Sequence, residues 1–85
     1  MKHELKIEEQ FADAILAGNK TFEIRLNDRG YQKGDYIKFR CVDNCGFNVY
    51  HKINGLTYQI TYVLSGWGLA ERFVVFSIKE MSDDK

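Results

Sequence analysis

The sequence lacks any apolar run of about eighteen residues, which is close to the minimum for a membrane-spanning helix. Its first six residues are mostly charged or polar, and no apolar stretch of the kind found in secretory signals follows them. We therefore expect a cytoplasmic protein with no membrane contact. In that compartment the two cysteines, Cys41 and Cys45, are expected to be reduced thiols.

Internal repeats and low-complexity tracts are also absent, and a chain of 85 residues has room for a single domain, 1–85. A domain of this length buries only roughly 60–65% of the surface of its unfolded chain, which favours a surface groove over an enclosed pocket. Apolar residues make up 45% of the chain and aromatic residues 14%, which is enough to build a core and excludes general disorder.

The chain carries no formal net charge, but its charges are unevenly distributed. Residues 20–52 are mildly basic, whereas the segments on either side are acidic. This distribution lacks the strong basic surface of proteins that bind long duplexes through phosphates. It fits a short or single-stranded nucleic acid, or a small anion.

Metal-binding patterns are weak. Cys41 and Cys45 are separated by three residues, with His3 and His51 elsewhere, and this spacing matches no common zinc site. We predict neither a metal nor a cofactor, and interpret the cysteines as isolated thiols.

Hydrophobic periodicity predicts one helix and five or six strands, and so an α+β domain that is mostly β. The helix is expected over 8–17, with Ile7, Phe11, Ala14 and Ile15 on its buried face and Gly18 ending it. Strands are expected around Leu5 and Ile7 and at 20–26, 35–42, 56–64 and 72–78, with a less regular one at 47–53. Asn54-Gly55 predicts a hairpin turn, Ser65-Gly66-Trp67-Gly68 a break and 82–85 a frayed end. With little helix to cover so many short strands, a curled sheet or small barrel is expected.

Strand 20–26 holds the most informative residues. Its alternation places Phe22, Ile24 and Leu26 on one face, which we expect to anchor the core. The other face presents Thr21, Glu23, Arg25 and Asn27, with Lys20 at the strand start. We expect this polar face to open on a cleft.

The segment Gly18-x-Lys20-x-x-Glu23-x-Arg25 resembles the signature of ASCH domains, which are related to the PUA RNA-binding fold. The start His3–Ile7, the turns Asn27-Asp28-Arg29 and Gly34-Asp35, and the segments Tyr62–Leu64 and Phe73–Ile78 resemble a small bacterial and phage group of ASCH-like proteins, the DUF3850 type. The similarity extends over nearly the whole chain.

The resemblance implies a β pseudo-barrel with one N-terminal helix and a cleft beside the signature strand. It also implies binding of RNA or a modified nucleotide. The residues that carry over as ligand-binding candidates are Lys20, Glu23, Arg25, Asn27, Asp28 and Arg29. A guanidinium suits bidentate contact with phosphate or a base edge, and a carboxylate can accept from an exocyclic amine.

Two alternatives stand beside this interpretation. The charged side chains of strand 20–26 could be an ordinary ion pair on a sheet face, and Asn27 and Asp28 could serve only the turn. The resemblance also extends to amidohydrolases that act on N4-acetylcytidine, for which Lys20 and Glu23 are the catalytic candidates. Those relatives carry a threonine where this chain has Glu23, and a glutamate in an insertion that is replaced here by the loop 65–71. Binding is therefore favoured over catalysis.

Trp67 lies between two glycines, and the sequence leaves its role open. It could be a stacking platform for a base or a lid packed on the core.

Overall fold

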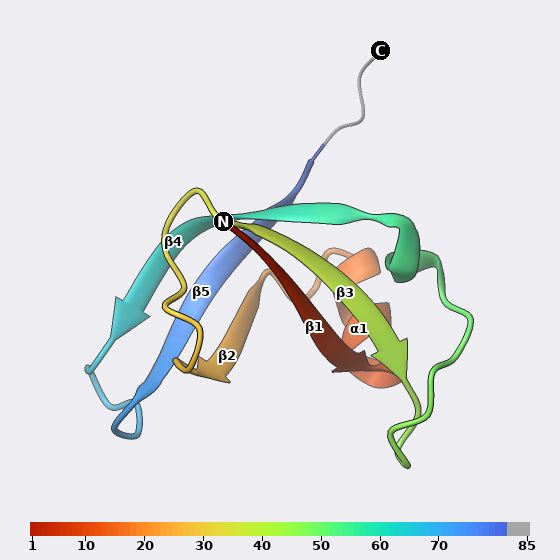
Figure 1. Cartoon of the computed structure of the whole chain (residues 1–85), viewed down its shortest axis with the longest axis horizontal. Helices are drawn as coiled ribbons and strands as arrows, with labels where there is room; N and C mark the ends of the chain where they lie inside the picture. Colours follow the sequence, from red (N-terminus) through yellow and green to blue (C-terminus); the bar gives the residue numbers. More distant parts are fainter. Residues whose placement is uncertain (82–85) are drawn as a thin grey trace.

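A computed structural model describes residues 1–81 and contains five strands, one α-helix and one 3₁₀-helix (Figure 1). The strands are β1 (Lys2–Glu8), β2 (Phe22–Leu26), β3 (Tyr36–Val42), β4 (Thr57–Ser65) and β5 (Phe73–Glu80). Helix α1 spans Glu9–Leu16, and the 3₁₀-helix η1 spans Lys52–Gly55. The expected α+β, mostly β architecture is confirmed. The expected frayed end, 82–85, lies outside the described residues.

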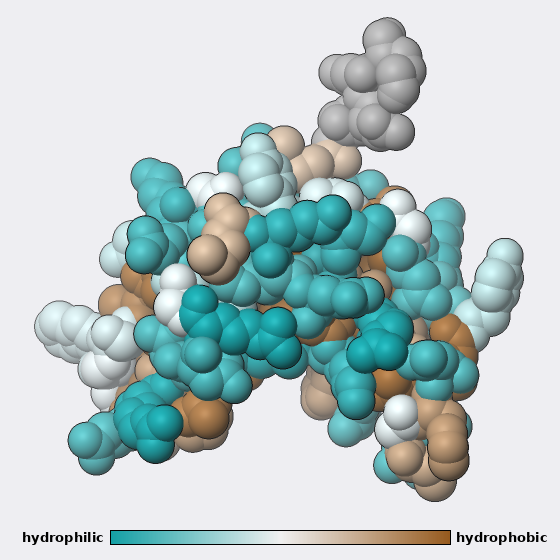
Figure 2. All heavy atoms as spheres, in the orientation of Figure 1, coloured by the Kyte–Doolittle hydropathy of each residue, from teal (hydrophilic) through white to brown (hydrophobic). Residues whose placement is uncertain are grey.

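All five strands belong to one sheet in the order β1-β3-β4-β5-β2, in which β1 pairs parallel with β3 and the other pairs are antiparallel. The sheet curls into a half-barrel. In Figure 1 the limb formed by β1 and β3 and the limb formed by β4 and β5 lean apart like the sides of an arch. The space-filling view is hollowed between these limbs and mostly hydrophilic on this face (Figure 2). Strands β1 and β2 are the two edges, and no strand pairing joins them.

The core lies on the inner face of the curl, to which alternate residues of the strands point. Helix α1 contacts β1 and β3, buries Ala12 and Ile15, and stops before Gly18, whose φ of +81° favours glycine. The expected stop is confirmed, but Phe11 stays 43% exposed instead of joining the buried face. The buried cluster comprises Leu5, Ile7, Ala12, Ile15, Tyr31, Ile37, Phe39, Cys41, Ile53, Tyr58, Ile60, Val74, Phe76 and Ile78.

The orientation of β2 is the reverse of the one predicted. Phe22, Ile24 and Leu26 are 40%, 52% and 38% exposed, whereas Glu23 is only 4% exposed. Glu23 pairs with the buried Phe76, so the polar face of β2 is turned inward. The alternation was right, because period 2 fixes which residues share a face; it does not fix which face is buried. Inward-pointing charges are also one way in which proteins protect an edge strand from unwanted pairing.

Two expectations for the segment after β3 were wrong. Residues 47–53 form no strand; a single bridge between Val42 and Asn48 is the only pairing there within the described chain. Asn54-Gly55 ends η1 and makes no hairpin. The side-chain oxygen of Asn54 accepts from the backbone N–H of Cys41 at 2.8 Å, so this asparagine ties the loop to β3. The strand expected at 72–78 is confirmed as β5, which lies inside the sheet between β4 and β2, as suits a segment that is apolar on both faces.

Candidate functional site

Three charged side chains of the signature segment form one connected cluster. One oxygen of Glu23 accepts from Lys20 Nζ at 2.5 Å, and the other accepts from Arg25 Nε at 2.9 Å. The Glu23 side chain is 5% exposed, and those of Lys20 and Arg25 are 17% and 25% exposed. A carboxylate this deeply buried needs charged partners, and two cations supply them. Glu23 and Arg25 therefore share one face of β2, as predicted.

Two arginines reach across the gap between the sheet edges. Arg25 Nη2 donates to the backbone oxygen of Lys6 at 2.7 Å, and Arg29 Nη1 donates to that of Glu4 at 3.2 Å. Both oxygens belong to β1, whose outer edge has no neighbouring strand. The guanidinium groups thus provide donors where a strand would otherwise pair, and they hold the curl closed.

A cleft of about 520 Å³ lies along this gap. Its walls come from the end of β1, the first turn of α1, and β2, together with Lys20 just before β2. The lining residues are Lys6, Ile7, Glu8, Phe11, Lys20, Phe22, Glu23, Ile24 and Arg25. The predicted cleft beside the polar face of β2 is therefore present, and it combines charged groups with apolar walls.

Aromatic rings flank the lysine of the cleft. Lys20 Nζ lies 5.0 Å from the ring centre of Phe22 and 5.6 Å from that of Phe11. Both rings are partly exposed, at 40% and 43%. The lysine also donates to the backbone oxygen of Phe22 at 2.6 Å, so its nitrogen is held between a carboxylate, a carbonyl and two aromatic rings.

The turn after β2 contributes less to the cleft than predicted. The side-chain oxygen of Asn27 accepts from the backbone N–H of Tyr31 at 3.1 Å. This is the turn-forming role that the sequence indicates as the alternative to ligand binding. Asn27 and Asp28 are exposed, and neither lines the cleft beside β2. Arg29 is also outside that lining, but its contact with β1 places it next to Arg25.

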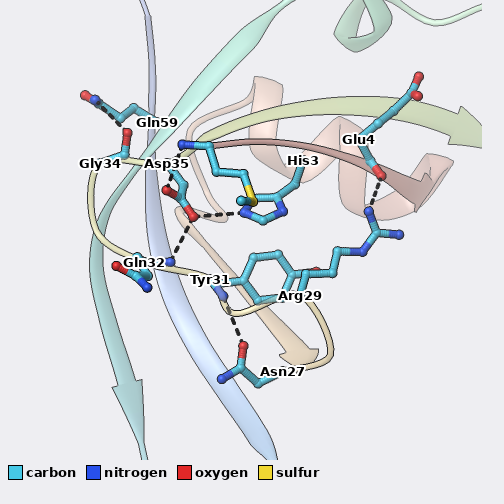
Figure 3. A network of polar contacts seen from close by, with 10 residues as sticks. His3, Glu4, Asn27, Arg29, Tyr31, Gln32, Gly34, Asp35 and Gln59 are labelled. Atoms are coloured by element: carbon cyan, nitrogen blue, oxygen red, sulfur yellow. Dashed lines mark hydrogen bonds and ion pairs between the residues drawn. The ribbon is translucent and has the colours of Figure 1, made fainter.

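Periodicity alone missed a buried polar network between the start of β1 and the turn before β3 (Figure 3). His3 Nε2 lies 2.9 Å from one oxygen of Asp35, and the N-terminal ammonium lies 3.2 Å from the other. The ring of His3 packs on that of Tyr31 with centres 4.8 Å apart. The sequence offered two signals: Asp35 follows a glycine just before β3, and His3 occupies an inward position of β1. The sequence alone predicts only a turn at Asp35 and gives His3 no role beyond a weak metal pattern.

Asp35 gives this network a pH dependence. Burial acts to raise the pKa of the Asp35 carboxyl, but hydrogen bonds from His3, the N–H of Gln32 and the N-terminal ammonium outweigh it and hold that pKa below its usual value. Because the folded pKa is depressed, the stabilisation is complete above the unfolded pKa of about 3.9 and is lost as the pH falls through the lower, folded pKa.

We predict that Asp35→Asn lowers the free energy of unfolding at pH 7 by about 1–2 kcal/mol. Below about pH 4, the free energy of unfolding of this variant should fall less with decreasing pH than that of the wild type. Urea unfolding at pH 7, 5 and 3 measures both effects. The control is Asp28→Asn, since Asp28 is exposed and makes no side-chain hydrogen bond within residues 1–81. Equal acid sensitivity of Asp35→Asn and wild type would contradict the prediction.

Within residues 1–81, no three His, Cys, Asp or Glu side chains come together as a metal site would require. Cys41 is buried and Cys45 exposed, and burial raises the pKa of the Cys41 thiol. No helix in this part of the chain has the length and apolar character needed to cross a membrane.

Comparison with known proteins gives a family and a fold. The model of the family described as "Domain of unknown function (DUF3850)" matches residues 2–78. The chain belongs to this family. Its structure is similar to one titled "Crystal structure of hypothetical protein PH0355", with a TM-score of 0.62 and 18% identity over 95% of this chain and 100% of that chain. At this identity the likeness concerns the fold alone. No curated protein matches the sequence.

Proposed function

We propose that this DUF3850 protein is a small ASCH-like module, related to the PUA fold, that binds RNA or a modified nucleotide in the cleft beside β2. One observation supports the proposal above the others: a buried carboxylate, Glu23, is held between Lys20 and Arg25 at a cleft with aromatic walls. The purely structural alternative accounts for the ion pairs. It gives no reason for partly exposed phenylalanines to stand around them.

The chemistry of the cleft suits a nucleobase. Phe11 and Phe22 offer π faces for stacking, which every base can use. Glu23 can accept from an exocyclic amine, and the planar guanidinium of Arg25 can donate to a base edge. The cleft is larger than a single base requires, so a nucleotide or the end of a single strand can enter it.

Removing an aromatic wall tests the proposal. We expect Phe22→Ala to weaken binding of short single-stranded RNA by about tenfold, because stacking is worth about 1–3 kcal/mol per base. The matched control is Phe47→Ala, since Phe47 is 71% exposed but does not line this cleft. Fluorescence anisotropy with labelled oligonucleotides measures the affinities, and thermal unfolding checks that both variants fold. Equal affinities for wild type and Phe22→Ala, or an equal loss in Phe47→Ala, would argue against base stacking here.

Amide hydrolysis is the less favoured function. Lys20, its candidate base, already donates to Glu23 and to the backbone oxygen of Phe22, so its nitrogen is engaged by two groups of the protein itself. A proton acceptor must reach the reacting group with a lone pair available. An assay for deacetylation of N4-acetylcytidine by wild type and Lys20→Ala separates the two functions. Turnover that is lost in Lys20→Ala would make hydrolysis the leading one.

A further inference from the structure

Tyr31 carries a polar group that the fold does not use. Its residue is only 5% exposed, and its ring packs between His3 and Phe76 with centres 4.8 Å away in each case. The hydroxyl has no hydrogen-bond partner within residues 1–81. The only side-chain nitrogen or oxygen in that range that is both buried and unpartnered is Arg40 Nε, so the Tyr31 hydroxyl reaches solvent. A buried ring thus presents a single free donor at the surface.

Two guanidinium groups bind β1 close to His3, the residue of that strand on which the Tyr31 ring packs. The backbone oxygens that they bind belong to Glu4 and Lys6, two residues apart on β1, which corresponds to about 6–7 Å along a strand. Burial raises the pKa of Tyr31, while the positive charges of Arg25 and then Arg29 act in the opposite direction. The net shift is upward, so the hydroxyl stays protonated at neutral pH and can donate.

Both arginines have N–H groups that make no hydrogen bond within residues 1–81. Arg25 uses Nε and Nη2 in its contacts with Glu23 and Lys6, and Arg29 uses only Nη1. A guanidinium has five N–H donors, so several on each side chain have no partner within the described chain. The carboxylates of Asp28 and Glu23 also act on Tyr31, so the charges around its hydroxyl are balanced. The feature that suits an added anion is therefore the set of unused guanidinium donors.

We propose that Arg25, which lines the cleft, forms a phosphate-binding subsite with Arg29 and the Tyr31 hydroxyl outside that lining, so that the ligand is a nucleotide and not a free nucleoside. This rests on the proposed function, which places the base beside Phe11 and Phe22. Arg25 then stands between the two parts, with Glu23 on the side of the base. Guanidinium groups bind phosphate through paired, charge-assisted hydrogen bonds, and a phenol adds a third donor.

The test compares ligands that differ only in phosphate. Isothermal titration calorimetry on the full chain would use the four ribonucleosides, their 3′- and 5′-monophosphates, dinucleotides with one phosphodiester, and inorganic phosphate. We expect at least one phosphorylated form to bind about tenfold more tightly than its nucleoside, as a hydrogen-bonded charge contact predicts. A preference for monophosphates over dinucleotides assigns the subsite to a terminal phosphate, and the reverse preference assigns it to the phosphodiester of a strand.

Tyr31→Phe is the decisive variant, because it keeps the packed ring and removes only the free hydroxyl. We expect it to lower affinity for the phosphorylated ligand by about fivefold, with no change for the nucleoside and no change in thermal unfolding. The matched control is Tyr58→Phe: Tyr58 is 4% exposed, its hydroxyl also lacks a partner within residues 1–81, and the nearest charge acting on it is that of Glu80.

Failure of the subsite and failure of the proposed function give different results. Nucleosides that bind as tightly as their phosphates, with no effect of Tyr31→Phe, would overturn the subsite and leave base binding intact. Inorganic phosphate that binds wild type but not Tyr31→Phe, with no selectivity for any base, would support the subsite and contradict nucleotide recognition. No binding of any ligand would overturn both, and equal losses in Tyr31→Phe and Tyr58→Phe would overturn the subsite.

Discussion

Replacing Glu23 with alanine is expected to lower the free energy of unfolding by about 2–3 kcal/mol, and the melting temperature by roughly 10 °C or more. The carboxylate is the shared acceptor for Lys20 and Arg25, and its loss leaves two partly buried cations beside each other. Removing one member of a buried ion pair costs about 3–5 kcal/mol, and the partial exposure of both cations reduces that cost. Thermal and urea unfolding measure the change.

Two further variants define what the carboxylate contributes. Glu23→Gln keeps the shape and one acceptor, so it should lie between wild type and Glu23→Ala. Glu4→Ala is the control, because the Glu4 side chain is exposed on β1, and only its backbone oxygen is bound by Arg29. Equal stabilities of Glu23→Ala and Glu4→Ala would mean that the cluster is too well hydrated to matter for the fold.

The second large effect is expected for binding. Arg25→Ala should weaken nucleotide affinity by about ten- to a hundredfold, since a hydrogen bond to a charged group is worth about 1.5–3 kcal/mol. It should also lower the free energy of unfolding by about 1 kcal/mol, because the side chain holds both Glu23 and the backbone of Lys6. Calorimetry with ligand and thermal unfolding on the same samples separate the two losses.

Arg25→Lys is the informative companion. It keeps the positive charge but not the planar fork, so a site that needs only charge would retain its affinity. We expect most of the affinity to be lost, since the proposed contacts use several donors of one guanidinium. A large drop in melting temperature with unchanged affinity in Arg25→Ala would assign this residue to the fold alone.

The inward charges of β2 have a clear structural consequence as well. Strands β1 and β2 are the unpaired edges of the curled sheet, and no ladder of backbone hydrogen bonds joins them. Arg25 and Arg29 cross that gap and bind oxygens of β1. A ligand can bind the N–H groups that remain on each arginine. Binding is then coupled to the contacts by which the same two arginines hold the β1 edge.

Several features of the fold follow from the sequence alone, because they depend on local chemistry. Helix α1 stops before Gly18, which adopts a positive φ, and the strand expected at 35–42 is present as β3, with Ile37, Phe39 and Cys41 buried. The apolar run of β5 indicates its interior position in the sheet. The signature segment indicated a charged cluster beside a cleft, since period 2 places Glu23 and Arg25 on one face.

Tertiary structure decided the rest, because burial depends on partners that are distant in the sequence. Which face of β2 points inward was set by its pairing with β5 and by the oxygen of Lys6 on β1 that Arg25 binds. The Asn54-Gly55 dipeptide forms no hairpin because the Asn54 side chain binds β3. The position of the Tyr31 hydroxyl depends on the packing of its ring between His3 on β1 and Phe76 on β5. No local sequence pattern predicts contacts between residues so far apart in the chain.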